Sequence, residues 1–450
     1  MKLKKYSCII GFYFFLVSTA FGQNIETIKA LVKLQSKTDS LEKKLQRQDS
    51  ALLDQSDILA AQQKKALKHD SDLVEIIGAL HRQYGIPAIA DEGFTIGIGA
   101  TMILQGTSVP NAVTSSQKRV ADASYSADLT FQKKFAKAGS RAFLHCEAAG
   151  GKGLDGDLLV FSRVNFDAVG PEGLRVAEAW YEQTFIEGGL YGVIGLMDPS
   201  LYFDCNVSAN DETTQFLNQL FVSSPVIEYP ARSPGLFYSP GIFLSVSPWD
   251  WLHLRAAAYD ANQDWQRIGD NLFNIGQIAF CPKILGWQGN YRLYGWFNQM
   301  PHTRWNNPAD SMENSYGFGV SFDQECNDLF TPFGRFGWRN PLVHLPASPS
   351  GTTSLSWSAG TQLNGKVWHR AGDGAGIAVG QLIASDDYAK QFPQAHAQPE
   401  THCELYYRIQ CFDKMSITPD FQYIVNPFGK DAPLTTSDIP VIGIRSEVDF

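Results

Sequence analysis

The chain has 450 residues, of which 44% are hydrophobic and 18% are charged, enough for one large folded domain or a few small ones. Its formal net charge of −9 argues against a nucleic-acid partner, because proteins that bind polyanions carry a basic domain. After the N-terminal segment no apolar run reaches the ~18 residues of a membrane-spanning helix, which excludes a helical membrane protein but not a β-barrel.

The N-terminus predicts a secretory signal peptide over residues 1–22. Three lysines precede an apolar stretch at residues 9–17, and Ala20 and Gly22 supply the small residues of a cleavage site. The sequence therefore predicts an exported protein.

Residues 23–83 predict an α-helical coiled coil. Apolar side chains occupy seven of the eight positions spaced seven residues apart from Leu31 to Leu80, with Thr38 as the exception, and the positions three residues after them complete the seam. The leucines expected in its core are Leu31, Leu45, Leu52, Leu59, Leu73 and Leu80. Glutamines in the middle of the seam are typical of layers that set register or oligomer number. The helix is expected to end near Gly85 and Pro87.

Residues 84–450 predict an all-β domain made of a transmembrane antiparallel β-barrel. Segments of about ten residues alternate polar and apolar side chains, as at residues 95–104 and 402–411, which is typical of strands with lipid on one side and a lumen on the other. At roughly 20–23 residues per strand and connection, this region holds about 16 strands. It contains 24 basic and 37 acidic residues, so the acidity of the chain belongs to this domain.

The C-terminal residue, Phe450, closes an amphipathic strand. A terminal aromatic residue in this position resembles the signal that the outer-membrane assembly machinery recognises. Six cysteines follow the signal peptide, without the spacing of a metal or redox motif. Cys403 and Cys411 share one face of a predicted strand roughly 26 Å apart, too far for a disulfide, and are expected to face lipid.

The chain from about Gly139 to Phe450 resembles the OprB-type carbohydrate-selective porins of outer membranes. The stretches that carry the resemblance are residues 147–154, 210–218, 289–296, 315–324, 404–408 and 417–427. The resemblance implies a sugar-conducting barrel in the outer membrane of a Gram-negative-type (diderm) bacterium, with small sugars as solutes and outer-membrane lipid around it. The coiled coil is an addition to this pattern, expected to reach into the periplasm. Because porin barrels commonly form trimers, a homotrimer is expected.

Selective sugar passage needs polar groups for hydroxyl pairs and aromatic faces for the sugar ring. Residues at lumen-facing positions supply both types, and the pore-lining or sugar-contact candidates are Glu178, Trp180, Glu182, Arg255, Arg292, Tyr294, Trp296, Glu404 and Arg408. For each one, a salt bridge within the barrel wall is the alternative to solute contact. Residues 198–230 lack clean alternation and predict either a loop that folds inward and narrows the pore or an external loop.

The sequence is compatible with three functions. The first is a carbohydrate porin, the second is a non-selective or cation-preferring diffusion pore suggested by the acidic barrel, and the third is a tether between the outer membrane and peptidoglycan. An enzyme is not expected, because the chain has neither a Gly-x-Ser-x-Gly elbow nor an H-E-x-x-H helix. No metal site and no cofactor are expected.

Overall fold

The computed structural model describes residues 93–112, 119–135, 139–167, 172–230, 237–263, 265–307, 313–344 and 349–450. The predicted signal peptide (1–22) and coiled coil (23–83) lie outside these residues, as do the six core leucines. Within the described residues, no helix is long and apolar enough to cross a membrane.

Sixteen long strands follow one another along the described part of the chain. They are β1 (Phe94–Thr107), β2 (Val120–Phe135), β3 (Ser140–Gly150), β4 (Gly173–Ile186), β5 (Leu190–Met197), β6 (Ser239–Trp249), β7 (Leu252–Asp260), β8 (Leu272–Phe280), β10 (Trp287–Arg304), β11 (Glu313–Gln324), β12 (Phe330–Arg339), β14 (Thr353–Asn364), β15 (Gly374–Ala384), β16 (Glu400–Phe412), β17 (Met415–Val425) and β18 (Ile439–Asp449). Two short strands, β9 (Lys283–Ile284) and β13 (Val343–His344), extend neighbouring strands. The α-helices within the described residues are α4 (Gln219–Val222) and α5 (Asp386–Gln391).

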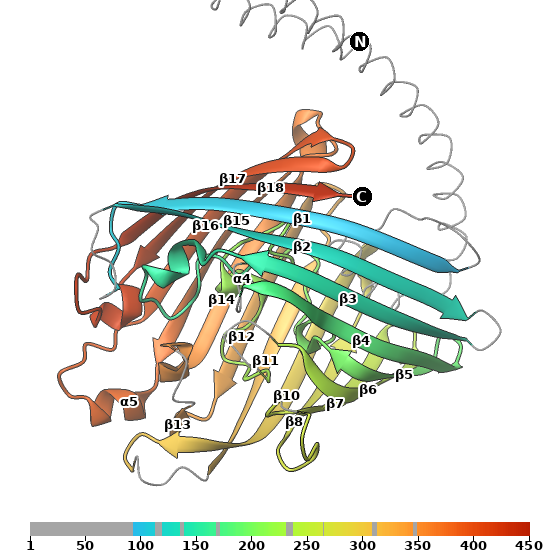
Figure 1. Cartoon of the computed structure of the whole chain (residues 1–450), viewed down its shortest axis with the longest axis horizontal. Helices are drawn as coiled ribbons and strands as arrows, with labels where there is room; N and C mark the ends of the chain where they lie inside the picture. The colour runs from blue at the N-terminus through green and yellow to red at the C-terminus, as the bar shows by residue number, and fades with distance from the viewer. Residues whose placement is uncertain are drawn as a thin grey trace, which may run out of the picture. The chain divides into compact units, whose positions relative to one another are not determined.

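The sixteen strands close into an antiparallel barrel (Figure 1). Each long strand pairs with the next, and β1 pairs with both β2 and β18, from Gly99 opposite Asp449 to Thr107 opposite Val441. Closure gives each of the sixteen long strands described here a partner on both sides, which a sheet in lipid requires. The prediction of a barrel of about 16 strands is therefore confirmed.

The period-2 alternation sorts side chains between the two faces of the wall. On β1, Ile98, Met102 and Leu104 are 47–58% exposed on the outside, whereas Thr101 and Gln105 are buried inside. The outer face is therefore apolar and suited to lipid, while the inner face carries polar groups. Phe450 follows β18 and pairs through its backbone with Ile98, 2.8 Å from amide to carbonyl, so it completes the closing seam.

Cys403 and Cys411 both lie on β16, as the alternation predicts. Both thiols are free and exposed. They share the outward face with Leu405, which is 52% exposed.

The connections divide into a short set and a long set at opposite ends of the barrel. Residues 187–189, 250–251 and 413–414 are short turns at one end, while 151–172 and 198–238 are the two longest connections at the other. In outer-membrane barrels short turns face the periplasm and long loops face outward. β1 begins and β18 ends at the short-turn end, so we assign this end to the periplasm.

Two long connections fold into the barrel, and we call their described parts the first inserted segment (151–167) and the second inserted segment (198–230). Phe203 packs on Phe243 of β6 with ring centroids 5.8 Å apart, and Phe216 packs edge-on against Tyr406 of β16 at 4.9 Å. Burial of large aromatic rings stabilises such packing, on the order of 2–3 kcal/mol per ring. Residues 198–230 therefore fold inward, and the external-loop alternative is wrong.

Candidate functional site

Arg335 of β12 binds the second inserted segment at several points. Its guanidinium donates to the Asp204 carboxylate at 3.1 Å, to the Asp204 carbonyl at 3.0 Å and to the Phe221 carbonyl at 2.6 Å. Both members of the Arg335–Asp204 ion pair are almost fully buried. Burial raises the pKa of Asp204 although Arg335 opposes the shift. The ion pair holds the first part of the segment against the wall.

Two further wall residues bind the backbone of the same segment. Glu404 of β16 accepts hydrogen bonds from the amides of Leu217 and Asn218, at 2.6 and 2.9 Å. Arg445 of β18 donates to the carbonyls of Glu212 and Gln215, at 2.6 and 2.9 Å. These contacts satisfy backbone groups that would otherwise be buried without partners.

The end of the second inserted segment is held through Glu228. Its carboxylate binds His302 at 2.8 Å, Arg339 at 3.1 Å and Ser315 at 3.1 Å. Burial by itself would raise the pKa of Glu228, but His302 and Arg339 together lower it below the ordinary value. A carboxylate stabilised in this way is a strong anchor between the segment and the wall.

The predicted lumen residues of β4 and β7 face inward and lie beneath the second inserted segment. Glu178 accepts from the Asp198 amide at 3.3 Å, and Glu182 pairs with Arg141 at 2.7 Å. Trp180 stacks on Phe143 with centroids 4.9 Å apart, and Arg255 donates to the Tyr202 carbonyl at 3.0 Å.

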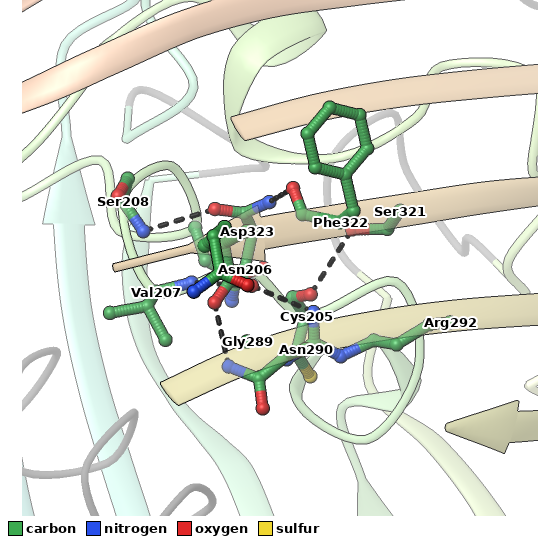
Figure 2. A network of polar contacts seen from close by, with 12 residues as sticks. Cys205, Asn206, Val207, Ser208, Gly289, Asn290, Arg292, Ser321, Phe322 and Asp323 are labelled. Atoms are coloured by element: carbon green, nitrogen blue, oxygen red, sulfur yellow. Dashed lines mark hydrogen bonds and ion pairs between the residues drawn. The ribbon is translucent and has the colours of Figure 1, made fainter. Parts of the chain in front are cut away.

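The predicted residues of β10 face inward as well. Arg292 pairs with Asp323 at 2.8 Å, and both side chains are at most 1% exposed. Figure 2 shows this network, in which Asp323 also accepts from Asn290 at 2.6 Å and from the Val207 amide of the inserted segment at 3.4 Å. Arg292 thus forms the wall salt bridge that the sequence left as its alternative to solute contact.

Two aromatic candidates of β10 belong to a buried cluster instead of an open surface. Tyr294 and Trp296 are 1% and 4% exposed and pack in a cluster with the inserted Phe203 and Tyr229. Of the nine predicted contact residues, eight are therefore covered. Their contact with a passing solute stays a prediction.

Arg408 is the ninth candidate, and it lines a cavity of about 600 Å³. We call this cavity the vestibule, because residues of the connections 325–329 and 365–373, which lie at the same end as the short turns, line it. Arg408 pairs with Glu447 at 3.1 Å, and residues Trp287 and Asp373 also line the space. Trp287, Asp373 and Glu447 were not among the predicted residues; Glu447 could have been found from its position on the polar face of the last strand.

A second, smaller cavity of about 50 Å³ lies between β2, β3 and the two inserted segments. We call it the acidic pocket, because five acidic residues line it: Asp128, Glu147, Asp167, Asp198 and Glu212. None of these was a predicted site residue, although Glu147 and Glu212 lie in stretches that carry the family resemblance. The sequence signal that could have found this pocket is the number of acidic residues in the two inserted segments.

A closed 16-strand barrel with an apolar outer wall, a polar inner wall and inserted segments that narrow its lumen defines a diffusion porin. The chain matches the family described as carbohydrate-selective porin, OprB family, over residues 122–450, and it belongs to that family. It is an outer-membrane porin for carbohydrates, and this family and fold are channels, not enzymes.

The solved structures support the same fold. A high-pH structure of Pseudomonas putida OprB superimposes with a TM-score of 0.69 at 16% identity, covering 80% of this chain and 95% of that one. A low-pH structure of the same porin gives a TM-score of 0.51 at 14% identity, covering 80% and 93%. Among curated proteins, none matches this sequence.

Proposed function

We propose that the vestibule is where this porin binds sugars during their passage. The observation that supports the proposal is a cavity of about 600 Å³ whose lining residues include charged ones and a tryptophan. Pockets of this size hold small organic molecules.

The chemistry of the lining suits a sugar. Arg408 and Glu447 can exchange part of their mutual hydrogen bonding for a pair of hydroxyl groups, because a guanidinium offers several donors and a carboxylate several lone pairs. Trp287 offers a flat apolar face for the sugar ring. Asp373 adds a fixed negative charge: burial by itself would raise its pKa, but hydrogen bonds from Arg370, Tyr407 and the Gln410 amide lower it to about 2, so it is ionised at neutral pH.

The test is sugar block of the ion current through full-length protein in planar bilayers. Trp287→Ala and Arg408→Ala should each weaken glucose block about five- to tenfold, equivalent to ~1–1.4 kcal/mol. Trp249→Ala is the matched control, because Trp249 is 58% exposed and stacks on Trp251 outside the vestibule. Unchanged block in both vestibule variants would disprove the proposal.

The acidic barrel favours a cation-preferring pore as the second candidate. The acidic pocket supports it, because negative charge beside a narrow path attracts cations and repels anions. Reversal potentials in a potassium chloride gradient test it: a preference for potassium that glucose does not affect would favour a general diffusion pore.

We further propose that residues 23–83 form a periplasmic coiled coil that joins three copies of residues 84–450 and contacts peptidoglycan. The heptad pattern of the leucines supports this proposal. Deletion of residues 24–83 should convert trimers to monomers, and membrane blebbing in the deletion strain would favour the tether. A normal cell envelope in the deletion strain would show that residues 24–83 do not act as a tether to peptidoglycan.

A further inference from the structure

The carboxyl groups of the acidic pocket differ in whether a cation neutralises them. Asp128 and Glu147 lie directly opposite each other on β2 and β3, an unfavourable pairing of like charges. Each has its own basic partner: Asp128 binds His145 at 2.7 Å, and Glu147 forms an ion pair with Arg175.

The three pocket carboxyl groups on the inserted segments, those of Asp167, Asp198 and Glu212, form no ion pair among the described residues. One oxygen of Asp167 accepts from Ser126 at 2.8 Å, while the other, Oδ2, is buried with no hydrogen-bond partner among the described residues. Asp167 is only 6% exposed and lines the pocket. The Asp198 carboxylate accepts from the amide and hydroxyl of Ser200, at 2.7 and 2.6 Å, and Glu212 lines the same space.

Burial raises the pKa of Asp167 to about 7, and Asp128 and Glu147 add to the shift. Burial also raises the pKa of Asp198, and that of Glu212 to well above its ordinary value. These carboxyl groups therefore lack close positive charge, because Arg445 near Asp167 and His145 near Asp198 do not offset their burial. A bound cation would supply it and would also occupy the unpaired Asp167 oxygen.

We propose that the acidic pocket binds a primary ammonium group, so that this porin takes amino sugars in preference to uncharged sugars of similar size. This inference rests on the carbohydrate porin function and names a solute class for it. An ammonium group has three donors, and Asp167, Asp198 and Glu212 provide three carboxyl acceptors. The pocket holds a few water-sized groups, which suits an ammonium group while the sugar ring stays in the lumen.

Aromatic side chains in the pocket lining also favour a cationic ligand. Phe166 and Phe237 line the pocket with centroids 5.8 Å apart, and aromatic faces attract ammonium groups. Sugar acids of the same size are expected to be rejected, because their carboxylates would meet the same acidic groups.

The test compares glucosamine, glucose and N-acetylglucosamine as blockers of the ion current at neutral pH. Glucosamine should block about tenfold more tightly than the other two, the effect of one charge-assisted contact. Asp167→Asn keeps the size of the side chain and should reduce this advantage to less than about threefold, and Glu212→Gln should reduce it as well. Asp250→Asn removes the same charge from an exposed turn and should keep the full advantage.

Equal block by glucosamine and glucose would overturn the inference, as would an unchanged glucosamine advantage in both variants. Failure of Asp167→Asn to assemble would show as loss of heat-modifiable mobility on gels. In that case the glucosamine advantage measured in Glu212→Gln tests the inference, because Glu212 is only half-buried. If glucose blocks but glucosamine gains nothing, the assignment of the pocket fails while the porin function stands. If no sugar blocks or crosses, the porin function itself fails.

Discussion

Replacing Arg335 tests whether the second inserted segment sets the width of the pore. Arg335→Met keeps the length of the side chain but removes the charge that pairs with Asp204 and the donors to the Asp204 and Phe221 carbonyls. Breaking a buried ion pair on one side typically costs about 3–5 kcal/mol, because the other charge stays buried alone. At ~1.4 kcal/mol per factor of ten, the detached state of the segment gains at least a hundredfold in population.

The barrel should survive this change, because backbone ladders around the whole circumference hold it together. We therefore expect larger and noisier single-channel conductance, and faster entry of trisaccharides in liposome-swelling assays. The double variant Arg335→Met with Asp204→Asn should recover much of the normal conductance, since no unpaired charge remains. An assembled Arg335→Met barrel with unchanged conductance and an unchanged sugar-size series would refute the reasoning.

Three other predictions follow from the structure and sequence. Arg292→Ala should lower the heat stability of the barrel while leaving sugar block unaltered, because Arg292 is buried in a wall salt bridge; weaker sugar block would instead support solute contact. Lowering the pH from about 8 to about 6 should reduce the preference for cations, since Asp167, with a pKa of about 7, becomes protonated and neutral in that range; a constant reversal potential would contradict this. Native mass measurement of the detergent-solubilised chain should give trimers that depend on residues 24–83, and monomers of the intact chain would show that the heptad interpretation is wrong.

The alternation of polar and apolar residues was sufficient to predict the barrel, its approximate strand number and the direction of most side chains. Side chains on a strand point to opposite faces in turn, and one face must meet lipid, so local sequence already separates Arg292 from its neighbour Leu293. The same rule placed Cys403 and Cys411 outside. These properties depend on residues that lie close together in the chain.

Only the tertiary structure decided which inward residues are open to the pore. Arg292 and Trp296 share a face by parity, but residues about 70–90 positions earlier in the chain fold over that face and cover both. Charge pairs such as Asp204 with Arg335 and Glu228 with Arg339 join residues more than 100 positions apart, and no local pattern encodes them. The acidic pocket arises in the same way, because its carboxyl groups come from two strands and two inserted segments that meet only once the barrel has closed.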